Sequence, residues 1–401
     1  MSAPNPMWNA ILRWSIAQMD PNDNVSDTAE VKEMTEERRQ FLLQAMESMV
    51  VDEIKRIKIV LCVLNMPLNS TDLRSVATEL TSIEEYKVEL TEAQRMTDGQ
   101  LLREVVWRKI CSLVELDDLV QGIDNANDLT NDKINGLPVL LAHLNSPFLG
   151  LRWRVAQVLA TVTQNNPKGQ LRATAGGVIP ALVANLTSLP YCRGEAKGSN
   201  STRTLPQLPT EYVESTPLRE GVDLDRDEME VEDDEADPAT RTRLAIQTVT
   251  KCVLALSALL RNNPEGLVQF EQLSGLEALQ TLLTRDGDKR LAKKVISLLR
   301  YFWRDPRYAQ RAVASVGPLI SMIGADDDID LREQALHALC ELMENPSFAA
   351  VALEPGNGLK EALLRRSKVC AGYTDPEDID MVRDEVTMLK QLLTHIFRPM
   401  F

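Results

Sequence analysis

Apolar residues recur at helical spacing in four long segments of this chain, residues 151–163, 244–260, 291–303 and 331–343. Shorter apolar segments led by a glycine recur as well, with no strand-like alternation between them. These glycines are Gly136, Gly177, Gly275, Gly317 and Gly358, at intervals of 41, 98, 42 and 41 residues. A period of about 42 residues is typical of armadillo or HEAT units. The pattern therefore predicts an all-α, armadillo-like helical repeat solenoid of about four repeats.

The one long interval exceeds the period by about 56 residues, which places an insertion at about 188–242, within the second repeat. This segment contains five prolines, and between Asp223 and Asp237 it has ten acidic residues against one Arg, a net charge of −9. Such a composition cannot bury enough apolar surface to fold. We expect a disordered acidic insertion that carries most of the chain's net charge of −15.

Helical patterns also flank the repeats on both sides. Thr35 can cap a helix with an acidic first turn, and apolar residues follow it at helical spacing. We expect a mobile N-terminal segment with a short amphipathic helix, a helical N-terminal cap, the armadillo-like repeats and a C-terminal capping helix. These regions span residues 1–33, 34–130, 131–375 and 376–401, respectively.

Composition and charge narrow the possible partners. Aromatic residues make up only 4% of the chain, which favours helices over sandwiches and barrels, and 59 acidic against 44 basic residues disfavour nucleic acid and anionic lipid. No run of about 18 apolar residues and no secretory signal pattern is present, so we expect a cytoplasmic protein without a membrane partner. The six widely spaced cysteines are interpreted as reduced thiols.

The residues of catalytic chemistry are sparse. The chain has three histidines, His143, His337 and His395, and none has a partner at the spacing that a metal or a nucleophile requires. No phosphate-binding glycine loop or nucleophile motif occurs. We therefore predict a binding protein that is not an enzyme and uses no cofactor or metal.

The third helix of each armadillo unit is expected to line the concave face, so its outward stripe is the predicted binding surface. The stripes of the first three long helices each begin with a cation, which suggests an acidic partner surface, although long cationic side chains can also extend from half-buried positions elsewhere. The predicted positions are Arg154, Gln157, Thr161, Lys251, Leu254, Lys294, Ser297, Tyr301, His337 and Glu341.

Several stretches of the sequence carry a family resemblance: residues 8–16 (WNAILRWSI), 35–39 (TEERR), 123–128 (IDNAND), 151–156 (LRWRVA) with 164–166 (QNN), and 257–262 (SALLRN). Together they resemble the armadillo-type nucleotide exchange factors of the 70-kDa heat-shock chaperone, the Hsp-binding-protein/Fes family. The resemblance covers most of the chain, and the long acidic insertion departs from the family pattern.

The resemblance implies a co-chaperone that clasps one lobe of the chaperone's nucleotide-binding domain in its concave face and promotes release of ADP. It further implies that the clasp includes Asn125, Ala126 and Asn127. We expect the chain to act as a monomer. An N-terminal segment would compete for the chaperone's substrate-binding cleft and help to release clients, or would instead dock on the protein's own repeats. Its apolar residues are Trp8, Ile11, Leu12, Trp14 and Ile16.

An adaptor that holds an extended peptide in the groove is the alternative function. Nuclear import carriers of that class resemble one another in a ladder of Trp and Asn on successive third helices. Here the corresponding pairs are Gln157/Thr161, Leu254/Ala258, Ser297/Tyr301 and His337/Glu341. The ladder is missing, so the sequence favours nucleotide exchange over peptide transport.

Overall fold

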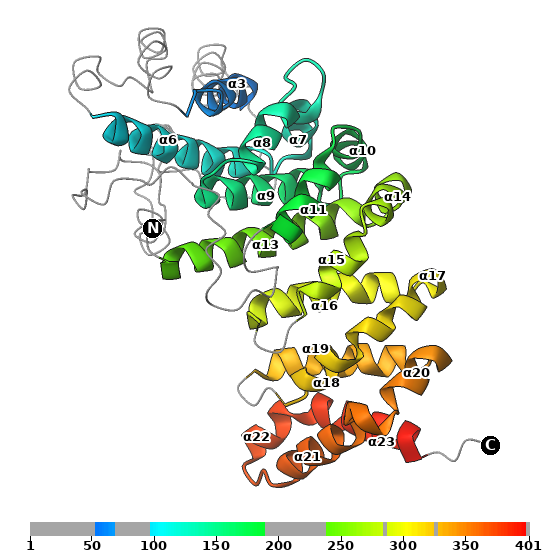
Figure 1. The fold of residues 1–401 in the computed structure, drawn as a ribbon. Coiled ribbons are helices and arrows are strands. Elements are labelled where there is room, and N and C mark those ends of the chain that lie inside the picture. Colours follow the sequence, from blue (N-terminus) through cyan, green and yellow to red (C-terminus); the bar gives the residue numbers. More distant parts are fainter. Residues whose placement is uncertain (1–52, 69–96, 189–237, 284–286, 325–327, 398–401) are drawn as a thin grey trace, which may run out of the picture. The chain divides into compact units, whose positions relative to one another are not determined.

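The computed structural model describes residues 53–68, 97–188, 238–283, 287–324 and 328–397, all within one compact unit, and every regular element in these ranges is a helix (Figure 1). From α7 (Ile123–Thr130) onward, the described helices follow one another as five triplets, each made of two shorter helices and one longer third helix. Their third helices are α9 (Leu149–Thr163), α13 (Pro238–Leu260), α16 (Lys289–Trp303), α19 (Ile329–Leu342) and α23 (Arg383–Phe397). The fold is therefore the predicted all-α, armadillo-like repeat arrangement.

The short helices form two further series. The first helices are α7 (Ile123–Thr130), α10 (Pro167–Ala175), α14 (Pro264–Gln272), α17 (Pro306–Ala309) with η4 (Gln310–Ser315), and α20 (Pro346–Ala352). The second helices are α8 (Leu137–Leu144), α11 (Val178–Ser188), α15 (Gly275–Thr281), α18 (Val316–Met322) and α21 (Leu359–Ala371). The short helices η5 (Pro355–Asn357) and α22 (Pro376–Met381) flank α21 in the last triplet.

Asparagine followed by proline marks three junctions between a third helix and the next first helix, and Asp305 followed by Pro306 marks a fourth. Asn165 has a left-handed φ of 53°, which stops α9, and the side chain of Asn166 then accepts a hydrogen bond from the backbone N–H of Gly169. Asn262 and Asn263 repeat this arrangement at the start of α14. The motif thus ends one helix and caps the next, because Pro suits the first turn of a helix.

Third helices pack on one another in chain order, and the core runs between them. Before the repeats, α6 (Asp98–Leu119) packs on α9 and on α3 (Glu53–Leu64), and the series continues through α13, α16, α19 and α23. Leu, Ile, Val and Phe side chains fill these contacts, and Phe270 of α14 stacks on Phe302 of α16 with ring centroids 5.4 Å apart. Helix α13 is long and apolar enough to span a membrane by length and composition, and 56% of its most apolar window is buried inside the protein.

Two expected boundaries differ in the structure. The sequence predicts an insertion that reaches about residue 242, whereas α13 begins at Pro238, where a proline suits the first turn and Thr242 Oγ1 donates to the Pro238 carbonyl at 2.8 Å. The segment predicted as a C-terminal cap contains α23, which packs on α19 as α19 packs on α16. Residues 1–52 and 189–237, which hold the expected N-terminal segment and the acidic insertion, lie outside the described residues.

Candidate partner-binding surface

We call the outward side chains of α9, α13, α16 and α19 at the predicted positions the third-helix row. The structure brings these side chains to neighbouring helices, since each of the four packs on the next. Lys294, Ser297 and His337 are exposed. Gln157, Thr161, Lys251, Leu254, Tyr301 and Glu341 are half-buried. A row of half-buried and exposed polar groups on successive helices can bind a protein surface along its length.

A polar network crosses from α6 to α13 at one end of this row. Thr161 Oγ1 donates a hydrogen bond to Asp117 Oδ1 at 2.5 Å, and Lys251 Nζ donates to Gln157 Oε1 at 2.8 Å. Burial raises the pKa of the Asp117 carboxyl, and the hydrogen bonds from Thr161 and Gln157 oppose that shift. The network joins three helices, so it orients Lys251 before any partner binds.

Arg154 does not lie on the open surface that the sequence predicts for it. Its side chain is only 4% exposed, and its guanidinium carbon lies 4.1 Å from the centroid of the Trp153 ring. Lys251 Nζ approaches the same ring at 5.8 Å. The cause is that α9 packs between α6 and α13. Stacking on an indole ring stabilises a guanidinium there. We correct Arg154 to a buried residue beneath the row.

The middle of the row is held together by contacts between successive repeats. The backbone N–H of Asn262 donates to the Tyr301 hydroxyl at 3.4 Å, and the Arg261 guanidinium lies 5.5 Å from the Tyr301 ring. Arg300 forms a two-pronged pair with Glu341, with Nε–Oε2 and Nη2–Oε1 distances of 3.0 and 2.6 Å, and Arg304 Nη2 adds a contact of 3.1 Å. These pairs hold the pKa of the Glu341 carboxyl below its usual value, against the effect of burial. Glu341 is therefore already paired within the chain.

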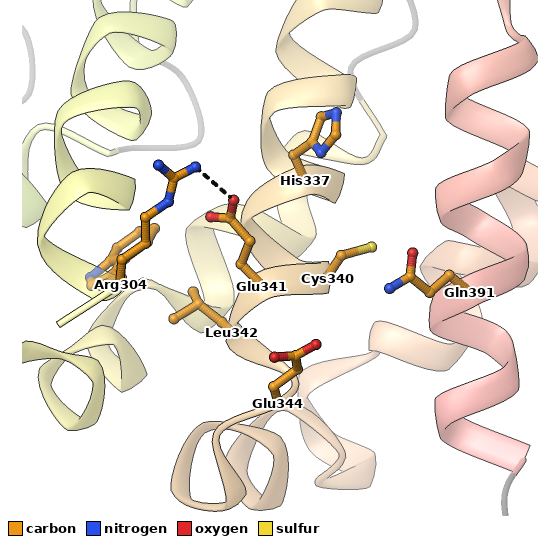
Figure 2. Close-up of a pocket in the computed structure, with 8 residues that line it drawn as sticks. Arg304, His337, Cys340, Glu341, Leu342, Glu344 and Gln391 are labelled. Atoms are coloured by element: carbon orange, nitrogen blue, oxygen red, sulfur yellow. Dashed lines mark hydrogen bonds and ion pairs between the residues drawn. The ribbon is translucent and has the colours of Figure 1, made fainter. Parts of the chain in front are cut away.

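A pocket of about 460 Å³ opens beside α19, between α16 and α23. Figure 2 shows His337, Cys340 and Glu341 along α19, with Arg304 on one side and Gln391 of α23 on the other. Burial raises the pKa of the Cys340 thiol to about 11, so the thiol stays protonated at neutral pH. The pocket can bind a partner side chain through the polar groups at its mouth.

The Asn125-Ala126-Asn127 stretch is not part of the third-helix row. These residues lie on α7, a first helix that packs on α3, α9 and α10. Ala126 is 2% exposed and belongs to the hydrophobic core, so we correct the expectation from the resemblance that it is part of the clasp surface. Asn125 Nδ2 donates to the Leu119 carbonyl at 2.8 Å, and the Asn127 carbonyl accepts from Arg172 Nη1 at 2.7 Å. The stretch links α7 to its neighbours. It belongs to the first triplet, whereas Lys294 belongs to the third.

Sequence patterns missed several residues that shape the surface. Asp117 and Arg300 form the ion pairs and hydrogen bonds described above, and Gln391 completes the pocket from the last helix. A stripe drawn on one helix cannot identify them, because each acts through a contact with a different helix. The predicted client-release residues Trp8, Ile11, Leu12, Trp14 and Ile16 lie outside the described residues.

The chain is similar in sequence to several named proteins. Over 353 residues it is 25% identical to Hsp70-binding protein 1 of Homo sapiens, an alignment that covers 86% of this chain and 75% of that protein. It is 26% identical over 271 residues to Hsp70 nucleotide exchange factor FES1 of Yarrowia lipolytica, covering 66% and 74% of the two chains. Nucleotide exchange factor SIL1 of Mus musculus is 26% identical over 229 residues, covering 54% of this chain and 37% of that one.

The resemblance expected from the sequence motifs is confirmed, because these relatives are named as Hsp70-binding proteins and nucleotide exchange factors. No family model matches the chain. Among solved structures, a designed armadillo repeat protein aligns with a TM-score of 0.43 and 13% identity, covering 71% of this chain and 94% of that one. The chain is thus similar in sequence to Hsp70 nucleotide exchange factors.

Proposed function

We propose that this protein is a nucleotide exchange factor, a co-chaperone that binds the nucleotide-binding domain of a cytosolic 70-kDa heat-shock chaperone and promotes release of ADP and of clients. The observation that carries the proposal is the alignment with Hsp70-binding protein 1, which spans 86% of the chain and so includes the repeats. The third-helix row supports it, since it offers a long polar surface on consecutive helices.

Nucleotide exchange needs binding energy and no covalent chemistry, so we infer that the protein is not an enzyme. The row would bind one lobe of the nucleotide-binding domain in the arrangement that has released ADP. A ligand shifts a conformational equilibrium only by its differential affinity for the two states. By thermodynamic linkage, ADP must then weaken the chaperone's affinity for this protein by the same factor by which this protein weakens ADP binding.

The proposal includes the partners and setting expected from composition: no nucleic acid, no membrane and a cytoplasmic location. The net charge of −15 supports the first two, because it repels phosphate and anionic lipid at long range. The residues proposed to contact the chaperone are Gln157, Thr161, Lys251, Leu254, Lys294, Ser297, Tyr301, His337 and Glu341. Arg154 is proposed to act from beneath, by supporting Trp153 next to Lys251.

Stopped-flow release of labelled ADP from a 70-kDa chaperone tests the proposal directly. We expect this protein to accelerate ADP release, and ADP to weaken its binding to the chaperone by an equal factor. Lys294→Glu should reduce the acceleration, whereas Lys368→Glu, an exposed residue of α21 outside the row, should leave it unchanged. If the release rate does not change while extended peptides bind the row, the protein is an adaptor instead.

Client release is expected to depend on the N-terminal segment. Deleting residues 1–20 removes the proposed client-release residues and none of the described helices. ADP release should therefore keep its full acceleration, and release of a labelled client peptide from the chaperone should slow. An equal loss of both activities would show that the segment supports the repeats.

A further inference from the structure

Taken together with the other charged residues of its helices and with those of α23, the third-helix row changes the sign of its charge between α16 and α19. On the α13 and α16 side, the exposed outward charges are Arg243, Arg290 and Lys294, and the half-buried Lys251 adds a fourth cation. Arg290 lies four residues before Lys294 on α16, and Arg243 lies eight residues, about two turns, before Lys251 on α13. We call this part of the row its basic half.

Acidic side chains gather on α19, just beyond its end and at the start of α23, a helix that also carries the exposed cations Arg383 and Lys390. Glu333 lies one turn before His337 on α19, Glu344 follows the end of that helix three residues after Glu341, and Asp384 lies two turns before Gln391 on α23. Burial raises the pKa of the Glu333 carboxyl, and the negative charges of Asp384, Glu385 and Asp330 raise it further. Like charges therefore accumulate here, and we call this part of the row its acidic half.

Ion pairs join the two halves of the row where α16 packs on α19. Lys293 Nζ lies 3.2 Å from Asp328 Oδ2 and 3.5 Å from Asp330 Oδ2, and Arg300 and Arg304 both pair with Glu341. Among the described residues, Lys294 on one side and Glu344 on the other have no hydrogen bond or ion pair. These two side chains are available to a partner, and they carry opposite charges.

The pocket lies on the acidic half. Its lining includes the Glu344 carboxylate, the Gln391 amide, the His337 ring and the Arg304 guanidinium, and Figure 2 shows Glu344 near the end of α19 with Gln391 across from it on α23. A carboxylate and an amide oxygen at the mouth of a recess can accept hydrogen bonds from an ammonium or guanidinium group. The recess thus suits a basic side chain of the partner.

We propose that the row recognises its partner by charge polarity: an acidic part of the partner surface lies on the basic half, and a basic side chain of the partner enters the pocket beside Glu344. This inference rests on the proposed function, and it revises the uniformly acidic partner surface that the sequence suggests. Opposite charges on the two halves allow the partner one orientation along the row, because the reversed orientation places like charges together.

Of two charge reversals, one tests the charged surface in general and the other distinguishes the two kinds of partner. Lys294→Glu weakens binding whether the partner surface is polar or uniformly acidic. Glu344→Lys weakens binding only if a basic group faces it, and it strengthens binding if the facing surface is acidic. The direction of the Glu344→Lys effect is therefore the decisive measurement.

The experiment measures association and dissociation of the purified full-length protein with the nucleotide-binding domain of a 70-kDa chaperone, at two salt concentrations. We expect Lys294→Glu and Glu344→Lys each to weaken binding about 3- to 10-fold at low salt, with a smaller effect at high salt. The matched controls are Lys368→Glu and Glu361→Lys, both exposed on α21, and each should change the affinity less than 2-fold. Unchanged circular dichroism shows that each variant is folded.

Each outcome separates the inference from the function on which it rests. A parent protein that neither binds the domain nor speeds ADP release overturns the proposed function and the inference with it. A parent that does both, with a Glu344→Lys variant that binds as well as or better than the parent, overturns the charge polarity alone. Weaker binding by both reversals, with silent controls, supports it.

Discussion

Two buried charged clusters, one before the repeats and one at their end, hold helices together by different means. In the first, Lys109 of α6 is 1% exposed, and its ammonium donates to the carbonyls of Leu64 and Met66 at 2.5 Å each. The third donor meets His143 Nε2 of α8 at 3.0 Å, while His143 Nδ1 donates to the Val139 carbonyl at 2.9 Å. Neutral acceptors thus surround a single charge.

The second cluster pairs opposite charges. Glu385 of α23 is 0% exposed and accepts hydrogen bonds from Arg332 of α19 at 3.1 and 3.3 Å, and from Arg366 of α21 at 2.5 and 3.1 Å. Burial opposes ionisation, but the two guanidinium groups outweigh it and hold the pKa of the Glu385 carboxyl below its usual value. The last helix is therefore attached by a buried carboxylate.

The difference lies in what remains when one group is removed. Without Lys109, the first cluster keeps neutral carbonyls and an imidazole that lack a donor. Without Glu385, the second cluster keeps two buried cations with no counter-charge. Buried unpaired charges cost more than buried unpaired neutral groups, so the second cluster should be the more sensitive of the two.

The largest effect is expected for Glu385→Gln. Removing the carboxylate should lower the free energy of unfolding by about 3–5 kcal/mol, because Arg332 and Arg366 stay buried without a counter-charge. Denaturant unfolding followed by circular dichroism measures this loss. Asp384→Asn, the exposed neighbour, is the matched control and should cost under about 0.5 kcal/mol. Equal losses for the two variants would mean that the buried carboxylate contributes no more to stability than an exposed one.

Acid should weaken the first cluster through His143. Burial, followed by the nearby charge of Lys109, lowers the pKa of His143 to about 4. The unfolded state then binds more protons than the folded state between about pH 4 and 6.5, so stability must fall as the pH drops through that window, by up to about 3 kcal/mol.

His143→Gln removes the titrating group and keeps an acceptor for Lys109. The fall in stability between pH 6.5 and 4 should therefore be smaller in this variant than in the parent. His337→Gln, an exposed residue of α19, is the control and should retain the parent's pH profile. A parent-like slope in His143→Gln would contradict the assignment of the acid sensitivity to this imidazole.

Lys109→Met should cost about 1–3 kcal/mol, less than Glu385→Gln, because it leaves neutral acceptors unsatisfied in a site of similar shape. The loss should be local to α3, since Lys109 connects the end of that helix to α6. Hydrogen exchange of the α3 amides, compared with Lys58→Met on the exposed side of α3, measures it. Faster exchange throughout the chain would show that the cluster supports more than this helix.

The smallest effect is expected for the segment that separates the two clusters in the chain. Replacing residues 189–237 with a short Gly/Ser linker should change the free energy of unfolding by no more than about 1 kcal/mol, since the cost of loop closure varies slowly with length. Such a replacement preserves α13 from Pro238 onward. A loss of the far-ultraviolet helical signal would show that this segment belongs to the core.

Much of the fold can be predicted from local patterns in the sequence. The predicted long helices at 151–163, 291–303 and 331–343 match α9, α16 and α19 to within about two residues, because apolar spacing and Asn-Pro junctions act over a few positions. The predicted helix begins at residue 244, whereas α13 begins at Pro238. The acidic and proline-containing sequence before Pro238 gives no apolar pattern from which the first turns of the helix could be predicted. Ala126 and Arg154 were misplaced because their burial depends on neighbouring helices.

The sequence by itself determined the helical class, the period of the repeat and the stripe of side chains that each third helix turns outward, because these depend on residues a few positions apart. Only the tertiary structure decided which charges near that stripe are buried or paired within the chain and which are left unpaired. Arg154 is covered by packing and Glu341 is paired by Arg300, while Lys294 and Glu344 keep free charges of opposite sign. Pairing between helices depends on residues that lie far apart in the chain, as in Arg300 with Glu341 and Arg332 with Glu385, and the pattern within one helix does not contain that information.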